Sequence, residues 1–68
     1  MFRVDASRIR ALVFDRELTI TEFAKAAKIN RLTAAKVLRD GTTVNGKTIA
    51  TLAGFFGVNG NELIEKKG

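Results

Sequence analysis

The excess positive charge of this chain lies in one segment. The 68 residues carry a net charge of +5 at pH 7. Between residues 25 and 47 the single anion is Asp40, and the six cations are Lys25, Lys28, Arg31, Lys36, Arg39 and Lys47. The rest of the chain has equal numbers of cations and anions, so this segment holds the whole excess. Cations concentrated in this way predict a polyanionic partner.

Other chemistry is poorly represented. The chain has no cysteine and no histidine, so it lacks thiolate metal ligands, disulfides and the most common general base. We therefore expect no metal, no cofactor and no enzyme. The absence of cysteine fits a reducing compartment. The start does not resemble a signal peptide, and no apolar run approaches the roughly 20 residues of a membrane span. A soluble, cytoplasmic protein is expected.

Residues 19–39 have the pattern of two short helices separated by a tight turn. Thr19 and Glu22 have the types and spacing of a capping box. One helical face then collects Ile20, Phe23, Ala24 and Ala27. Asn30 is a second N-cap signal, followed by an apolar stripe of Ala34, Val37 and Leu38. The outward face of the second helix then holds Arg31, Leu32, Ala35, Lys36 and Arg39. This pattern is typical of a helix-turn-helix whose second helix lies in the major groove of DNA.

A hydrophobic staple, in which apolar residues precede a capping residue and follow it by four positions, occurs five times. The instances are Val4-Asp5-Ile9, Leu18-Thr19-Phe23, Ile29-Asn30-Ala34, Val44-Asn45-Ile49 and Val58-Asn59-Leu63. They predict helices near 6–16, 20–27, 31–40, 46–56 and 60–66. Glu62 completes a second capping box with Asn59. Residues 41–46 are predicted to be a loop, with Gly41 as a left-handed residue after the third helix. No strand is predicted, and residues 1–68 are expected to be a single all-α domain.

Six fragments follow one another along this framework: Arg8–Leu12, Leu18–Ala24, Ile29–Thr33, Thr48–Ala53, Phe56–Val58 and Glu62–Leu63. Their order and spacing resemble the lambda-repressor-like, Cro/repressor-type (Xre-like) helix-turn-helix family. The resemblance implies a compact five-helix DNA-binding domain. It also implies a small transcriptional regulator of the repressor type, from a phage or mobile element, that binds palindromic double-stranded operator DNA as a homodimer.

The resemblance also implies site residues. The positions that face DNA bases in the family correspond here to Asn30, Arg31, Leu32, Ala35 and Lys36. Phosphate contacts are expected from Thr19, Thr21, Arg39, Thr42, Thr43, Asn45 and Lys47. Backbone amides at the helix N-termini near 20, 31 and 46 are expected to add to them. The expected dimer contacts are Phe55 and Val58.

The residue types at these positions fit DNA, although each has a simpler interpretation. Arginine at position 31 matches guanine O6 and N7, Lys36 matches guanine or phosphate, and Leu32 and Ala35 match a thymine methyl group. Asn30 matches adenine, although its capping role competes for the same side chain. The alternatives are that Arg31 and Lys36 form a solvated surface and that Leu32 is merely exposed. Phe55 is expected to be exposed near the last two helices and to make a dimer contact. Its alternative is packing against the first helix or over the last one.

Four departures from the family pattern lead to further predictions. Glu17 and Lys28 stand where the family commonly has glycine, so both are expected to adopt left-handed geometry. Ile20 replaces a glutamine that helps to hold DNA, so a phosphate contact is lost or passes to Thr19 or Thr21. At Val13 and Leu38, where many members have an arginine–glutamate pair, an apolar contact is expected instead.

Two other functions remain open at this stage. The same fold serves as a protein-interaction module in antitoxins and antirepressors, and the apolar Leu32 and Phe55 are compatible with that role. A binder of nucleic acid without sequence preference is the other possibility, and it predicts a steep salt dependence.

Overall fold

Four α-helices begin at the predicted capping residues. The computed structural model describes residues 1–65, and its α-helices are α1 (Ala6–Asp15), α2 (Ile20–Ala27), α3 (Arg31–Val37) and α4 (Gly46–Phe56). At each start a side-chain oxygen accepts a hydrogen bond from the backbone amide three residues later. The four caps are Asp5, Thr19, Asn30 and Asn45. Each cap satisfies a helical N–H that has no partner within the helix.

The fifth predicted helix is a single 3₁₀ turn, η1 (Gly60–Leu63). The prediction of a fifth α-helix near 60–66 was therefore wrong. Residue 66 lies outside the described residues. The Glu62 carboxylate does accept a hydrogen bond from the Asn59 backbone amide at 3.2 Å, as the capping box predicts. The turn cannot continue, because Ile64 is extended and bridges to Val4.

Two short strands lie where none was predicted. β1 (Phe2–Arg3) pairs antiparallel with β2 (Thr43–Val44), with Phe2 opposite Val44. The Val4 amide extends the pairing by donating to the Thr42 carbonyl at 2.9 Å. The N-terminal segment thus fixes the conformation of the predicted loop 41–46.

Helix α3 ends at Val37, three residues before the predicted end. Tight turn bonds follow it, from the Leu38 amide to Ala35 and from the Arg39 amide to Lys36. Gly41 is left-handed, with φ +82°, but it lies in the turn toward β2 and not directly after the helix. The helix stops because the chain turns there toward β2, where Thr42 bonds to Val4.

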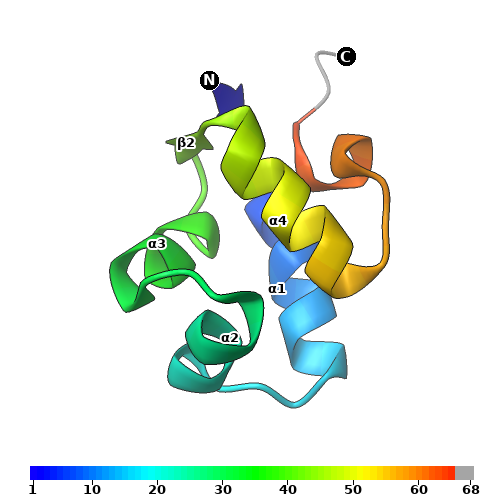
Figure 1. The fold of residues 1–68 in the computed structure, drawn as a ribbon. Helices are drawn as coiled ribbons and strands as arrows, with labels where there is room; N and C mark the ends of the chain where they lie inside the picture. Colours follow the sequence, from blue (N-terminus) through cyan, green and yellow to red (C-terminus); the bar gives the residue numbers. More distant parts are fainter. Residues whose placement is uncertain (66–68) are drawn as a thin grey trace.

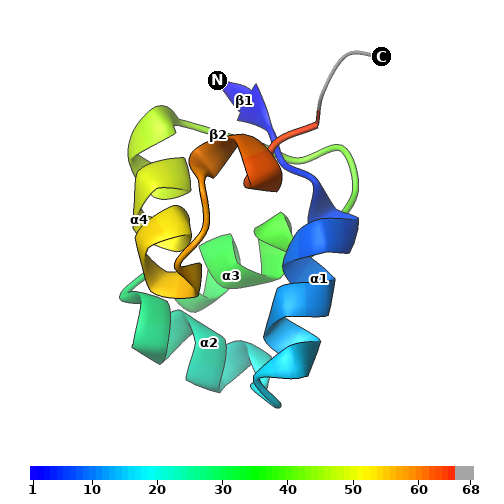
Figure 2. The ribbon, with the colours of Figure 1, turned by 90° about the vertical axis from the view of Figure 1, so that its right-hand side faces the viewer.

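The helices enclose one apolar core. Figure 2 shows α1 and α4 on opposite sides of the fold, with α3 between them and α2 across one end. The largest fully buried side chains come from every part of this frame: Phe23, Ile9, Leu52, Leu63, Val4 and Val37. Small residues Ala24, Ala27 and Ala34 are buried on α2 and α3, which lets these two helices pack closely. Figure 1 shows α2 and α3 joined by their short turn on one side of α4.

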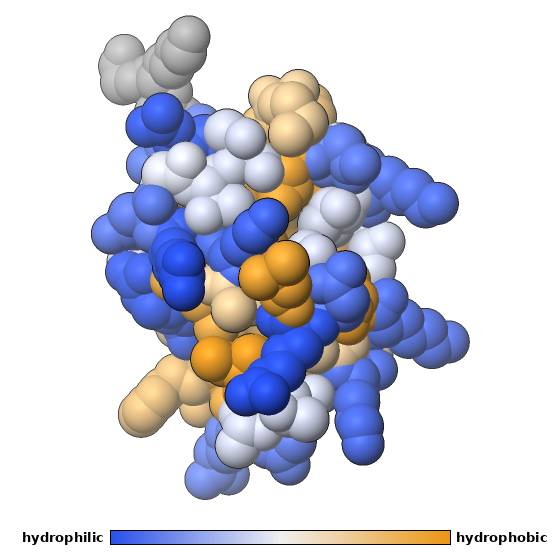
Figure 3. Space-filling view, turned by 90° about the vertical axis from the view of Figure 1, so that its left-hand side faces the viewer, coloured by the Kyte–Doolittle hydropathy of each residue, from blue (hydrophilic) through white to orange (hydrophobic). Residues whose placement is uncertain are grey.

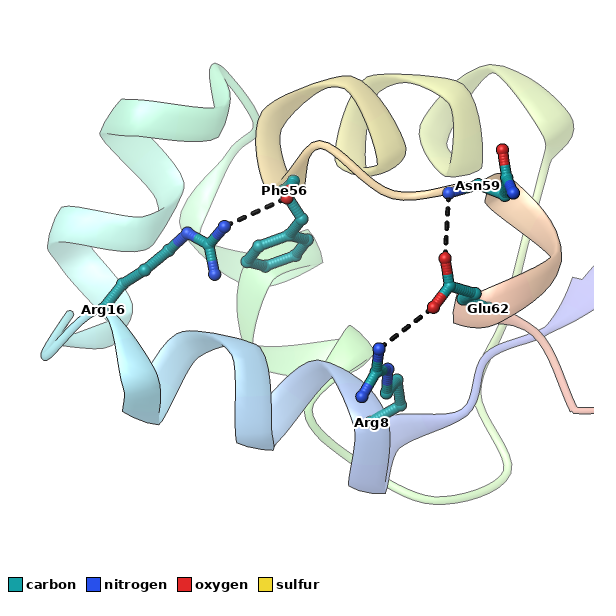
Figure 4. A network of polar contacts seen from close by, with 5 residues as sticks. All are labelled: Arg8, Arg16, Phe56, Asn59 and Glu62. Atoms are coloured by element: carbon teal, nitrogen blue, oxygen red, sulfur yellow. Dashed lines mark hydrogen bonds and ion pairs between the residues drawn. The ribbon is translucent and has the colours of Figure 1, made fainter.

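Three phenylalanine rings pack together where α2 meets the C-terminal end of α4. The Phe23 ring lies 5.7 Å from Phe56 and 6.0 Å from Phe55, between ring centroids. The Arg16 guanidinium stands 5.1 Å above the Phe56 ring and donates to the Phe56 carbonyl at 3.0 Å (Figure 4). These contacts join the C-terminal ends of α1 and α4 across the core. Among residues 1–65, no helix has the length and apolarity that crossing a bilayer requires.

Candidate nucleic-acid interface

The turn between α2 and α3 depends on one left-handed residue. Lys28 has φ +58° and ψ +42°, and the amide of Ile29 then bonds back to the Ala24 carbonyl at 3.0 Å. Glu17, after α1, is also left-handed, with φ +54°. Both predictions of left-handed geometry at non-glycine positions are therefore confirmed. The turn reverses the chain so that α3 starts beside α2.

Burial fixes which face of α3 points outward. Ala34 and Val37 are fully buried, so the opposite face is exposed to solvent. On that face Arg31 and Lys36 are exposed, and Leu32 is 64% exposed. Ala35 is half-buried at the edge of the face. Figure 3 views the side of the molecule on which α3 lies, where hydrophilic groups surround a smaller apolar area.

The fifth predicted base contact, Asn30, is already occupied. Its side-chain oxygen accepts a hydrogen bond from the Thr33 amide at 2.7 Å. The side chain thus holds the first turn of α3 in place, and its amide NH₂ group is left as the donor. The sequence leaves open whether the Asn30 side chain caps α3 or contacts a base. In the structure its oxygen caps the helix.

The cations of the basic segment have no acidic partners within residues 1–65. The salt bridges in that part of the chain join Arg3 to Glu65, Arg8 to Glu62 and Arg10 to Asp40. None of them involves the six segment cations, namely Lys25, Lys28, Arg31, Lys36, Arg39 and Lys47. The carboxylate of Asp40, the single acidic residue of the segment, lies 3.7 Å from the Arg10 guanidinium and forms no salt bridge to any of those six within residues 1–65. With respect to residues 1–65, the six cations therefore keep their positive charge unneutralised.

The arginines divide into two groups according to whether their side chains make contacts within residues 1–65. All four that precede residue 20 make contacts within the fold: Arg3, Arg8, Arg10 and Arg16. Arg31 and Arg39 make no side-chain hydrogen bond or salt bridge to residues 1–65, and both are exposed. Figure 4 shows two of the first group, with Arg8 bonded to Glu62 and Arg16 bonded to Phe56. A guanidinium without an internal partner keeps its full donor capacity for a ligand.

The expected phosphate contacts lie around the same helix pair. Six of them are exposed: Thr19, Thr21, Arg39, Thr43, Asn45 and Lys47. Thr42 is half-buried, and its carbonyl is bonded to the Val4 amide. The Asn45 side chain caps α4 through the Thr48 amide at 2.9 Å. The loop residues among them are held by β1, a contact between distant parts of the chain that local sequence patterns do not reveal.

The N-terminus of α2 already carries an anion. The Glu22 carboxylate accepts a hydrogen bond from the Thr19 amide at 2.9 Å, and the Thr19 hydroxyl accepts one from the Glu22 amide at 3.1 Å. The Thr19 amide, and secondarily its hydroxyl, lower the pKa of Glu22 below its ordinary value. The carboxylate is therefore charged at neutral pH. Because it accepts the hydrogen bond of the Thr19 amide, that amide is not available to a phosphate at the N-terminus of α2.

A polar link joins α1 to α3 beside the positions where an apolar contact is expected. Val13 is buried in the core, and Leu38 is half-buried and packs against that core. In addition, the Arg10 guanidinium donates to the Leu38 carbonyl at 2.8 Å. Sequence reasoning missed Arg10 because its acceptor is a backbone oxygen 28 positions away, which no residue type can indicate.

The predicted dimer residues are less exposed than expected. Phe55 and Val58 are both half-buried, and Phe55 lies 4.9 Å from Phe56 between ring centroids. Part of the Phe55 surface is thus used inside the fold, against Phe23 and Phe56. The most exposed phenylalanine is instead Phe14, at 81%, near the end of α1.

The comparison with known families agrees with this geometry. The model of the Cro/C1-type HTH DNA-binding domain matches residues 8–67, which include all of α1 to η1 except the first two residues of α1. The chain belongs to this family. Neither the curated proteins nor the solved structures contain a significant match to the chain. As a Cro/C1-type HTH domain, the protein has DNA as its ligand class.

Proposed function

We propose that this Cro/C1-type domain binds double-stranded operator DNA in a sequence-specific manner and regulates transcription, as a small repressor of the phage or mobile-element type. Residues 1–68 act as one domain in the cytoplasm and catalyse no reaction. Helix α3 lies in the major groove, with its exposed face toward the base edges. Family membership supports DNA as the ligand, and the outward face of α3 supports this docking.

The observation that carries the proposal is the unpaired state of Arg31 and Lys36. Both stand on the exposed face of α3, opposite the fully buried Ala34 and Val37, and neither has an acidic partner in residues 1–65. Arg31 contacts guanine O6 and N7 through its two-pronged guanidinium, and Lys36 contacts guanine or phosphate. Asn30 and Ala35 lie at the margin of the same contact.

Phosphates on either side are held by the polar residues around the helix pair. These are Thr19, Thr21, Arg39, Thr42, Thr43, Asn45 and Lys47. Such contacts fix the position of the domain on the duplex but do not select its sequence. Two copies bind a palindrome through Phe55 and Val58, which keep part of their apolar surface outside the core.

Selection from a randomised duplex pool at roughly physiological salt tests the proposal. A palindromic motif with half-sites about one helical turn apart is expected. A single short motif would retain specific binding and remove the dimer. Recovery of no motif, together with a steep loss of affinity as salt rises, would replace the proposal with non-specific binding.

One observation favours a second candidate, a protein-interaction module of the same fold. Phe14 is 81% exposed and lies on α1, which is not part of the helix-turn-helix. An exposed aromatic ring of this kind is a common anchor at protein interfaces. A stoichiometric protein partner whose binding is lost in Phe14→Ala, combined with weak and fully salt-screened DNA binding, would favour this function.

A further inference from the structure

We propose that Leu32 makes operator binding depend on a methyl group at C5 of a pyrimidine, so that thymine and 5-methylcytosine both satisfy the same contact. The inference rests on the proposed function, because it requires α3 to lie in the major groove. It adds a regulatory consequence: cytosine methylation within the operator strengthens binding at this position.

The exposure of Leu32 sets it apart from the other leucines. It is 64% exposed, whereas Leu52 and Leu63 are fully buried. A small rotation of α3 cannot bury it, because Val37 and Ala34 are fully buried on the other side and would then become exposed. The fold therefore holds an apolar side chain of four carbons outward, in the middle of the proposed contact.

The surroundings of Leu32 indicate what covers it. Arg31 precedes it directly and Lys36 lies one helical turn further on, and both are exposed and without acidic partners in residues 1–65. An apolar protein surface is a poor match for this side chain, since the two cations would have to be desolvated with it. A polyanion satisfies the cations, and its groove must then offer an apolar group to Leu32.

The major groove of DNA offers one such group. The base edges there present hydrogen-bond donors and acceptors, except for the C5-methyl group of thymine. Leucine cannot pair with the donors and acceptors, and covering them without a partner costs free energy. Contact with the methyl group buries apolar surface on both sides and is favourable. Cytosine methylated at C5 presents the same methyl group at the same place in the groove.

The test uses the duplex recovered by selection and replaces each thymine in turn with deoxyuridine, which removes the methyl group alone. At one position in each half-site, we expect the dissociation constant to rise about fourfold, the value of one buried methyl group. At that position, a 5-methylcytosine–guanine pair is expected to bind about fourfold more tightly than a cytosine–guanine pair.

Leu32→Ala is the matched variant, and its exposed position and alanine's helix propensity keep α3 folded. In this variant the deoxyuridine and thymine duplexes are expected to bind equally. Methyl dependence that persists in Leu32→Ala overturns the inference, and so does equal binding of the two duplexes by the wild type. In both cases the specific motif survives, so the proposed function stands. Recovery of no motif overturns both.

Discussion

The Arg10 guanidinium donates a 2.8 Å hydrogen bond to the backbone carbonyl of Leu38, and so ties α1 to the C-terminal end of α3. The same group lies 3.7 Å from the Asp40 carboxylate. A cation at this place satisfies a carbonyl that the end of α3 leaves without a helical partner. We therefore expect Arg10 to affect DNA binding by positioning α3 and not by touching DNA.

Arg10→Ala is expected to lower the free energy of unfolding by about 1 kcal/mol, because the bond is charge-assisted but partly exposed. Below the melting transition it should also weaken binding to the selected duplex more than binding to a scrambled duplex. Arg3→Ala is the control, because this substitution also removes one arginine charge and one salt bridge, that between Arg3 and Glu65. Equal losses on both duplexes for Arg10→Ala would show that it contributes charge alone.

The capping box at the start of α2 gives a pH-dependent stability. The pKa of Glu22 is lowered in the folded protein, mainly by the Thr19 amide, so its carboxylate stabilises the fold above the ordinary glutamate pKa. That contribution is lost as the pH falls through the folded-state pKa. In urea unfolding at pH 7, the free energy of unfolding should be larger for the wild type than for Glu22→Gln. This difference should vanish at strongly acidic pH. Thr19→Ala, which removes the N-cap, should lower the free energy of unfolding by about 1 kcal/mol at pH 7. A difference for Glu22→Gln that is constant with pH would exclude this role of the charge.

Lys28 occupies left-handed backbone space, in which a Cβ atom is unfavourable. Lys28→Gly is expected to raise the free energy of unfolding by up to about 1 kcal/mol, less the added entropy of the unfolded chain. Lys25→Gly, three residues earlier within α2, should lower it by about 1 kcal/mol. Thermal unfolding of both variants checks the prediction, since each loses one lysine. A loss of stability in both would contradict the geometry of the turn.

The dimer surface is tested by two matched charges, one at Val58 and one on α4. Val58→Glu places a carboxylate on the proposed interface, whereas Ala50→Glu places one on an exposed position of α4. Val58→Glu should weaken cooperative binding to a palindrome by more than about tenfold, because the charge would be buried without a partner. Ala50→Glu should have a small, general electrostatic effect. If Ala50→Glu alone abolishes cooperativity, the dimer uses the groove that includes Phe2, Ile49 and Ile64 instead.

Local sequence signals predicted those parts of the fold that depend on near neighbours. The caps at Asp5, Thr19, Asn30 and Asn45 bond to amides three residues away, so their types and spacing sufficed. The left-handed geometry of Glu17 and Lys28 was predictable because the family has glycine at both positions.

What the sequence did not predict depends on contacts between distant residues. The pairing of Phe2 with Val44 fixes the loop after α3, and the bridge from Val4 to Ile64 ends η1. Strands of two residues have no detectable alternation. The same limit applies to charge. The sequence places the excess in residues 25–47, but it does not reveal that Arg31 and Arg39 lack side-chain contacts to residues 1–65 of the kind that Arg8 and Arg16 make.

The central claim, that the unpaired cations of α3 select the DNA sequence, is tested most directly by one titration. The dissociation constants of the selected and scrambled duplexes are measured for wild type, for Arg31→Ala with Lys36→Ala, and for Lys25→Ala. We predict that the double variant loses most of its preference for the selected duplex, by roughly tenfold or more for the lost guanine contact. Lys25→Ala should weaken both duplexes to a similar, small extent. An unchanged preference in the double variant would contradict the account.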